Sequence, residues 1–246
     1  MTTAISTAKL FTQLAEPFTA EVLFDQLPDI VFFIKDAEGR YVAVNRTLVE
    51  RCGLVSKRDL LGKRPSDVLG ETLGRSYESQ DASVIRSGQP IVDQLELHIV
   101  RSRDIGWCLT SKLPLAGKEG KNVGLVGASR DLGLPDVSSD EFEHIADAID
   151  YAERNISSRP TIRELAHIAD MSVYQLDRRM QRVFGLTTGQ WYLKTRISFA
   201  SRLLVESDTP IADVAFEAGY ADQSSFTRQF RRSTGLSPSQ YRNLRR

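Results

Sequence analysis

Hydrophobic and polar residues alternate along the first half of the chain in short runs that are typical of β-strands. The segments 29–36 and 40–45 flank a polar turn and predict a β-hairpin. Three further runs of the same kind cover 90–100, 107–117 and 122–132. Helical patterns separate the hairpin from these runs, and the helix predicted over 71–88 closes at Gly88. The predicted order is two strands, several helices and three strands.

The second half of the chain shows only the helical period. Residues 133–141 are rich in turn and helix-cap residues, so we place a linker there. The segment 141–156 then carries apolar residues at helical spacing, which predicts one helix. These residues are Phe142, Ile145, Ala146, Ile149 and Ala152. The fold class predicted is an α+β domain with a five-stranded antiparallel sheet, followed by an all-α domain.

The all-α half contains an internal repeat of about 50 residues. Segments 160–185 and 209–235 each predict a short helix, a tight turn and a second helix, the arrangement of a helix-turn-helix unit. The matching pairs are Ile162 and Ile211, Leu165 and Val214, Ala166 and Ala215, Ala169 and Ala218, and, after a one-residue offset, Leu176 and Phe226, Met180 and Phe230, and Gly185 and Gly235.

Individual residues predict the conformation of the two turns and the helix that connects the units. Gly219 predicts a positive φ in the second turn, and Asp170 holds the matching position in the first. Ser172 is the predicted N-cap of the next helix. Between the units, the apolar spacing over 189–208 predicts one helix of about 18 residues, or ~27 Å. That length brings the two second helices near the ~34 Å spacing of successive major grooves.

Residues 160–246 resemble the DNA-binding domain of AraC/XylS-type transcription regulators. The stretch "IADVAFEAGYADQSSFTRQFRRSTGLSPSQYR" at 211–242 carries that family's signature, whereas the first unit departs from it at Asp170 and Met180. The resemblance implies that the second helix of each unit reads double-stranded DNA. The base contacts it implies are Tyr174, Asp177, Arg178, Gln223, Ser224, Ser225 and Arg228. The phosphate contacts it implies are Arg179, Arg182, Arg231 and Arg232.

The side-chain chemistry suits those roles. Arg178 and Arg228 can each bond guanine bidentately, and Gln223 suits adenine. Asp177 can accept from cytosine N4, or it orients Arg178 or Arg182. On both second helices the bulky apolar residues Leu176, Phe226 and Phe230 are predicted to be core residues.

The N-terminal half resembles a PAS domain over about 110 residues, 21–132. The run from Asp36 through Gly39 to Asn45 and the closing "GASRDL", in which Asp131 is expected to end the last strand, carry the resemblance. It implies a sensor with a pocket between sheet and helices. The candidate wall residues are Phe32, Ile34, Val42, Val44, Leu95, Leu97, Leu109 and Val126, although for each of them an ordinary core position is the simpler interpretation. Residues 1–20 form a lead-in.

Composition adds few constraints. The net charge is zero, but from Pro160 onward 13 basic residues face 8 acidic ones, an excess of +5. Cys52 and Cys108 form no CxxC pair, and the histidines have no metal-ligand spacing with them, so we predict no cofactor and no metal. No signal peptide or membrane span is recognisable, which favours a cytoplasmic protein.

Two functions remain open for the N-terminal half. In the favoured interpretation the chain is a transcriptional regulator, and the family resemblance favours an activator. Its PAS-like domain senses a small molecule or state and modulates promoter binding. In the alternative, that domain is a constitutive dimerisation or protein-docking module. RNA polymerase and a second copy of the chain are the further partners expected. The chain carries no GxSxG, P-loop or HExxH motif, and we predict no enzymatic activity.

Overall fold

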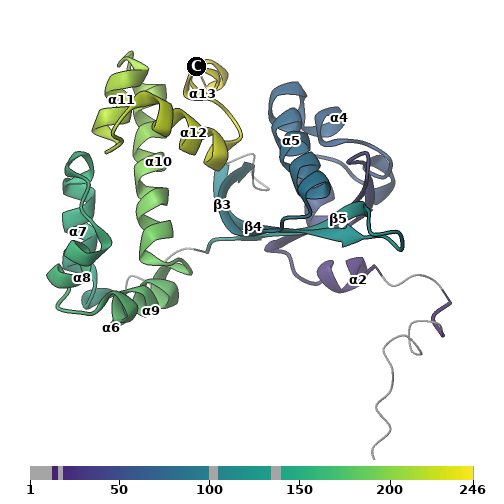
Figure 1. The fold of residues 1–246 in the computed structure, drawn as a ribbon, viewed down its shortest axis with the longest axis horizontal. Helices are drawn as coiled ribbons and strands as arrows, with labels where there is room; N and C mark the ends of the chain where they lie inside the picture. Colours follow the sequence, from purple (N-terminus) through teal and green to yellow (C-terminus); the bar gives the residue numbers. More distant parts are fainter. Residues whose placement is uncertain (1–12, 16–18, 100–104, 134–139, 246) are drawn as a thin grey trace, which may run out of the picture.

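A computed structural model describes residues 13–15, 19–99, 105–133 and 140–245. It shows a sheet with helices in the first half of the chain and helices alone in the second (Figure 1). The predicted order of an α+β domain followed by an all-α domain is therefore confirmed. Within the described residues, no helix is long and apolar enough to cross a membrane.

The sheet has five strands in the order β2-β1-β5-β4-β3, and all neighbours are antiparallel. The strands are β1 (Ile30–Asp36), β2 (Tyr41–Val44), β3 (Ile91–Ile99), β4 (Ile105–Ala116) and β5 (Asn122–Asp131). The predicted hairpin is β1–β2, and its turn holds Gly39 at φ +79°. Asp131 ends the last strand, as expected.

Short helices and one long helix cover one face of the sheet, which we call the inner face. They are α3 (Arg46–Arg51), η1 (Lys57–Asp59), α4 (Pro65–Leu69) and α5 (Glu71–Ser87), and they are preceded by α2 (Glu21–Phe24). Asn45 starts α3 by accepting a hydrogen bond from the Leu48 amide, and Gly88 ends α5 at φ +67°. Leu60, Leu125 and other apolar residues form a core beneath these helices.

The outer face of the sheet is apolar on β3 and β4, and the helical half covers it there. Leu95 and Leu109 pack in the core of the first helix-turn-helix unit, while Leu97 packs against that of the second. Trp107 lies between the two cores, and its Nε1 donates to Ser198 Oγ at 3.1 Å. The two halves of the chain therefore share a packed interface.

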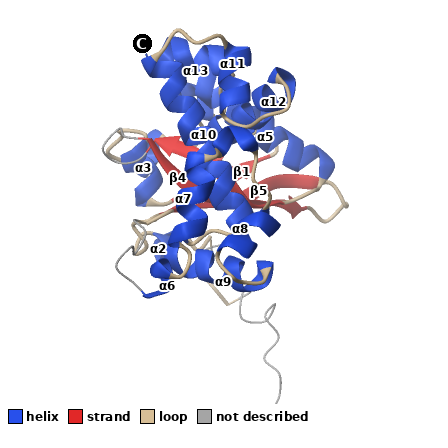
Figure 2. Cartoon of the chain, turned by 90° about the vertical axis from the view of Figure 1, so that its left-hand side faces the viewer, coloured by secondary structure: helices blue, strands red, loops and turns tan. Residues whose placement is uncertain are grey.

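The second half consists of helices arranged along one long helix, α10 (Figures 1 and 2). They are α6 (Asp140–Glu143), α7 (Ala146–Arg154), η2 (Ile156–Ser158), α8 (Ile162–Ile168), α9 (Val173–Phe184), α10 (Thr188–Glu206), α11 (Ile211–Glu217), α12 (Gln223–Thr234) and α13 (Pro238–Arg245). The single helix predicted over 141–156 is instead α6, α7 and part of η2. The chain turns tightly at Ile145, whose amide donates to the Phe142 carbonyl at 3.0 Å.

Helix α10 has 19 residues, about 28 Å in length, and connects two separate cores. Trp191 and Tyr192 near its start pack in the first core, whereas Ile197, Ala200 and Leu204 pack in the second. The predicted connecting helix is confirmed, and it places α8 and α9 at one end and α11 and α12 at the other (Figure 1).

Candidate nucleic-acid interface

The two helix-turn-helix units have the same backbone hydrogen bonds at their turns. The Met171 amide donates to the Ala166 carbonyl at 2.9 Å, and the Tyr220 amide donates to the Ala215 carbonyl at the same distance. The residue before each donor has a positive φ, +51° for Asp170 and +74° for Gly219. The predicted left-handed position is confirmed in both units, and it sets the angle at which the second helix leaves the turn.

The second helices, α9 and α12, start and end in similar ways. Ser172 accepts a hydrogen bond from the Gln175 amide at 3.3 Å, which confirms the predicted N-cap. In the second unit Asp222 accepts from the Ser225 amide at 2.7 Å, and this bond lowers the pKa of the Asp222 carboxyl. Left-handed glycines follow both helices, at φ +68° for Gly185 and +76° for Gly235.

Each of these helices turns an apolar side toward its core. Leu176, Phe226 and Phe230 are fully buried, as predicted, and Met180 fills the place that Phe230 takes in the second unit. In the second core Tyr220, Phe226, Phe230 and Tyr241 form a series of ring contacts between 5.2 and 5.4 Å. The buried side fixes which residues of α9 and α12 can face a partner.

Most of the predicted base-contacting residues lie on the exposed side. Tyr174 is 68% exposed, and the Arg178 guanidinium lies 6.0 Å from the centre of its ring. Gln223, Ser224 and Arg228 are exposed on the first turns of α12. Ser225 is half-buried, and its hydroxyl donates to the Asp222 carbonyl at 3.0 Å. Both helices thus present polar side chains from their N-terminal turns.

Asp177 has a different position from the one predicted. Its carboxylate accepts hydrogen bonds from the Thr188 amide, at 2.8 Å, and from the Thr188 hydroxyl. The carboxylate therefore stabilises the start of α10, where backbone amides are free to donate. The carboxylate orients neither Arg178 nor Arg182, and Arg182 pairs with Glu141 instead. The assignment of Asp177 as a base contact is therefore corrected: in this structure it caps α10.

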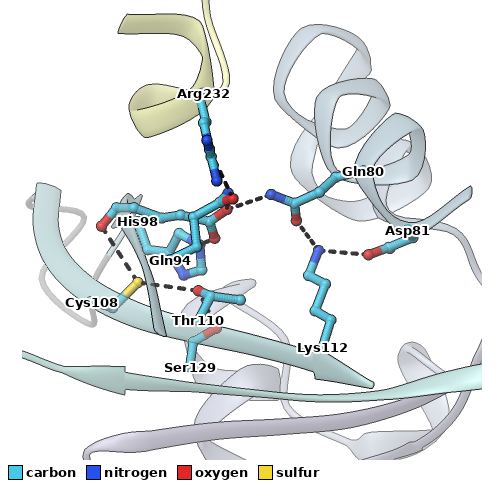
Figure 3. A network of polar contacts seen from close by, with 10 residues as sticks. Gln80, Asp81, Gln94, His98, Cys108, Thr110, Lys112, Ser129 and Arg232 are labelled. Carbon is cyan, nitrogen blue, oxygen red and sulfur yellow. Dashed lines mark hydrogen bonds and ion pairs between the residues drawn. The ribbon is translucent and has the colours of Figure 1, made fainter. Parts of the chain in front are cut away.

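Three of the predicted phosphate-contacting arginines are engaged by other parts of the chain. Arg179 pairs with Glu141 of α6 at 2.6 Å, and Arg182 pairs with the other oxygen of the same carboxylate. Arg232 Nε donates to Gln94 Oε1 of β3 at 3.1 Å (Figure 3). The fourth, Arg231, is exposed and lines a cleft of about 540 Å³ between α12, α5 and β3. The linker and the sheet thus contact the surface expected to meet DNA.

Comparisons with known proteins agree with both halves of this structure. A helix-turn-helix domain model matches residues 165–244, and a PAS fold model matches residues 24–134. The chain joins a PAS domain to an AraC-type helix-turn-helix domain.

Two relatives of this chain are named as transcriptional regulators. The probable transcriptional regulator LumQ of Photobacterium leiognathi is 32% identical over 91 residues, which cover 37% of each chain. The bifunctional transcriptional activator/DNA repair enzyme AdaA of Bacillus subtilis is 26% identical over 95 residues, 39% of this chain and 45% of AdaA. This chain thus spans less than half the length of either relative.

Among solved structures, the DNA-binding domain of AdpA, the global transcriptional factor, was determined in complex with a target DNA. It is 31% identical to the PAS–AraC chain and covers 41% of it and 90% of its own length, with a TM-score of 0.39.

Arg196 of the AraC-type domain is a positioning residue that the sequence analysis missed. From α10 it donates through Nε to the Ala218 carbonyl at 2.8 Å and through Nη2 to the Gly219 carbonyl at 2.6 Å. Its guanidinium also lies 3.8 Å from the centre of the Tyr220 ring. It therefore holds the second turn against α10. An arginine within a helical pattern gives no sign in the sequence that it bonds a turn 22 residues later.

We expect Arg196→Ala to lower the free energy of unfolding by about 2 kcal/mol, because it removes two charge-assisted hydrogen bonds and a cation–π contact. Urea denaturation followed by circular dichroism measures this. Arg202→Ala is the matched control, since Arg202 is an exposed arginine on the same helix. Equal losses in the two variants would contradict the role assigned to Arg196.

The pocket of the PAS domain has different walls from those predicted. It lies on the inner face of the sheet and is lined by Val31, Phe33, Lys35, Tyr41, Leu48, Arg51, Cys52, Leu69, Leu73, Tyr77, Glu96, His98, Lys112 and Ser129. None of the eight predicted wall residues is among them. Val44 lies in the inner core, and Val42 is exposed at the irregularity in the pairing of β1 with β2. The other six are on the outer face: Phe32, Ile34, Leu95, Leu97, Leu109 and Val126.

Strand alternation explains this correction. Consecutive side chains point to opposite faces, and the predicted wall residues all belong to the apolar set. In the structure the polar set, with Lys35, Glu96 and Lys112, is buried beneath the helices. The apolar residues of β3 and β4 are used instead to pack against the AraC-type domain.

Proposed function

We propose that this chain is a sequence-specific DNA-binding transcriptional regulator that reads two major-groove segments on one face of a duplex. The observation that carries the proposal is the structural duplication: α9 and α12 share turn geometry, caps and buried faces, and they lie at opposite ends of α10 (Figures 1 and 2). A helix about 28 Å long suits two sites separated by one turn of B-DNA, about 34 Å.

The proposed contacts follow from exposure and chemistry. Arg178 and Arg228 each bond a guanine, and Gln223 bonds an adenine. Tyr174, Ser224 and Ser225 complete the base-facing surface. The arginines Arg179, Arg182, Arg231 and Arg232 bond phosphates, which positions the helices without reading sequence.

Selection from a library of random duplexes tests this proposal. We expect an enriched motif in two parts, with centres about 10 base pairs apart, because each helix enters the groove on the same face of the DNA. A motif confined to one short segment would mean that only one unit reads bases. The recovery of unselected duplexes would contradict sequence-specific binding.

We further propose that the PAS domain senses a small molecule or state and modulates promoter binding. The contact between β3 and α12 supports this, because Arg232 reaches Gln94 and also belongs to the proposed phosphate-binding set. A change in the sheet that moves Gln94 would change the DNA-facing surface. In the alternative, the PAS domain is a constitutive dimerisation or docking module, and its occupancy leaves DNA affinity unchanged.

Activation through contact with RNA polymerase is part of the same proposal, as is a homodimer formed through the PAS domain. The relative AdaA is a transcriptional activator by name, which supports activation over repression. The chain's own cysteines do not favour a second, enzymatic role. Burial raises the pKa of Cys52 to about 11, so this thiol stays protonated at neutral pH and is a poor nucleophile, and Cys108 is buried.

Glu141 offers a separate test of the phosphate-binding arginines. We expect Glu141→Gln to raise affinity for non-specific DNA about two- to fivefold, because Arg179 and Arg182 no longer have to leave a carboxylate to bind phosphate. Fluorescence anisotropy over a range of salt concentrations measures the affinity. Glu143→Gln removes the same charge from an exposed site on the same helix. If both variants gain equally, overall charge and not the pairing accounts for the gain.

A further inference from the structure

The inner pocket of the PAS domain is small and has both apolar and charged walls. Its volume is about 60 Å³. A space of this size suits a ligand of only a few non-hydrogen atoms. The side chains of Leu48, Leu69 and Leu73 supply an apolar wall from the helices.

Arg51, at the end of α3, has unused hydrogen-bonding groups in this pocket. Its side chain is 6% exposed, and its Nη2 pairs with Asp131 Oδ2. Arg51 Nε and Nη1 and Asp131 Oδ1 are buried without a hydrogen-bond partner among the described residues. Leaving such groups unpaired is costly in a folded protein, and a guanidinium fork matches a carboxylate in geometry and charge. The two Arg51 donors therefore indicate that the missing partner is an acceptor, whereas Asp131 Oδ1 is left for a donor such as water.

The other charged groups of the pocket are already paired, and cations outnumber carboxylates on its walls. Lys35 and Lys112 share the carboxylate of Asp81, at 2.5 and 2.6 Å. His98 lies 3.1 Å from Glu96. Burial lowers the pKa of His98, but Cys108 and Glu96 raise it by more, to about 10, so the imidazole is charged. Four cationic side chains thus line the pocket with one carboxylate, Glu96.

We propose that the PAS pocket binds a small organic monocarboxylate, held by Arg51 through its carboxylate and by the leucine wall through its aliphatic part. This inference rests on the proposed sensing function and names its ligand class. The oxygens of such a ligand satisfy Arg51 Nε or Nη1, which no side chain of the pocket does. Small monocarboxylates of this kind include acetate, propionate and butyrate.

A chain of hydrogen bonds connects this pocket to the DNA-facing surface (Figure 3). Lys112 donates to Gln80, Gln80 donates to Glu96 at 2.5 Å, and Gln94 donates to Glu96 at 2.6 Å. Gln94 in turn accepts from Arg232 of α12. A carboxylate in the pocket repels Glu96 and competes for its cationic neighbours, so it alters the network that ends at Arg232.

The test compares each acid with its amide on the full chain. Acetate, propionate and butyrate have nearly the same shape as acetamide, propionamide and butyramide but differ in charge. At constant ionic strength, we expect at least one acid to raise the melting temperature and to shift NMR resonances of the PAS domain, while its amide does neither. Equal binding of acid and amide, or binding of none of the three acids, would overturn the proposal.

Variants of Arg51 provide the second arm. We expect Arg51→Gln to weaken binding of the acid at least tenfold, because a charge-assisted contact is lost, and Arg51→Lys to give an intermediate loss. Arg58→Gln removes an exposed arginine from the same region and should leave binding unchanged. Unchanged binding in Arg51→Gln would assign the anion to another site and reject this one.

Operator affinity of the same preparation separates this inference from the proposed function. If a carboxylate binds through Arg51 but does not change operator affinity, the binding site is supported and the proposed sensing function is contradicted. Failure of the wild-type chain to select any DNA would contradict the proposed function as a DNA-binding regulator. The comparison of acid and amide would still show whether the PAS pocket binds a carboxylate.

Discussion

Replacing Arg178 and Arg228 together by alanine should weaken binding to the selected operator by about 2–6 kcal/mol, or roughly 30-fold to more than 10⁴-fold. Each arginine is exposed on its own helix, and one good bidentate contact with guanine contributes about 1–3 kcal/mol of discrimination. The two sites lie at opposite ends of α10 and share no partner, so their losses should add. Fluorescence anisotropy with operator and scrambled duplexes at one salt concentration measures both affinities.

The control must separate base contacts from general charge. Arg58→Ala/Arg202→Ala removes two exposed arginines outside α9 and α12 and should leave operator affinity within about twofold of the wild type. The double variant of Arg178 and Arg228 should lose little affinity for scrambled DNA. An equal loss on operator and scrambled duplexes would show that the two arginines bind phosphate and do not read bases.

Gly219→Ala should destabilise the AraC-type domain by about 3 kcal/mol. Gly219 has φ +74°, where a residue with Cβ is strained by about 1–2 kcal/mol. An added Cβ would also lie 2.3 Å from the Ile156 carbonyl oxygen, so the backbone of η2 would have to move. For a domain of about 100 residues this corresponds to a fall of more than 10 °C in melting temperature. Thermal unfolding followed by circular dichroism measures it.

Two other positions give matched comparisons. Gly189 lies in the first turn of α10, where an added Cβ meets nothing within 4 Å, so Gly189→Ala should be neutral or slightly stabilising. Asp170 holds the position that matches Gly219, at φ +51°, and Asp170→Gly should stabilise the first unit by up to about 1 kcal/mol. If Gly219→Ala changed the stability only slightly, the backbone of η2 would have to move at little cost, and the second turn would not require glycine.

Much of this architecture could be predicted from local chemistry. The period of about 50 residues, the left-handed positions at Asp170 and Gly219 and the cap at Ser172 are visible because each depends on a few adjacent residues. The buried positions of Leu176, Phe226 and Phe230 follow from helical spacing. The five strands follow from alternation, although alternation does not say which face of a sheet is covered.

What could not be predicted depends on contacts between distant segments. Lys35, Glu96 and Lys112 look like residues of a solvated face, yet they are buried because Asp81, Gln80 and His98 satisfy them. From the sequence, Asp177 is a candidate base contact, but in the structure its carboxylate accepts a hydrogen bond from the Thr188 amide. Arg196 reaches a turn 22 residues away, and no local pattern records such a contact.

The interface between the domains bears directly on regulation. Arg232 contacts Gln94 of the PAS sheet, and Arg179 and Arg182 contact Glu141 before the first unit. If these arginines bind phosphate as proposed, DNA and these internal partners compete for the same guanidinium groups. On the proposed account, the state of the PAS pocket alters one side of this competition through Glu96 and Gln94, and therefore alters DNA affinity.

The most direct test of the central claim is to incubate the purified full chain with sheared genomic DNA from its own source and to sequence the recovered fragments. We predict that a few regions upstream of genes are enriched, that they share a motif in two parts about 10 base pairs apart, and that Arg178→Ala/Arg228→Ala loses this enrichment. Recovery of fragments without sequence selection, or of the same regions by the double variant, would contradict the account of α9 and α12 as DNA readers.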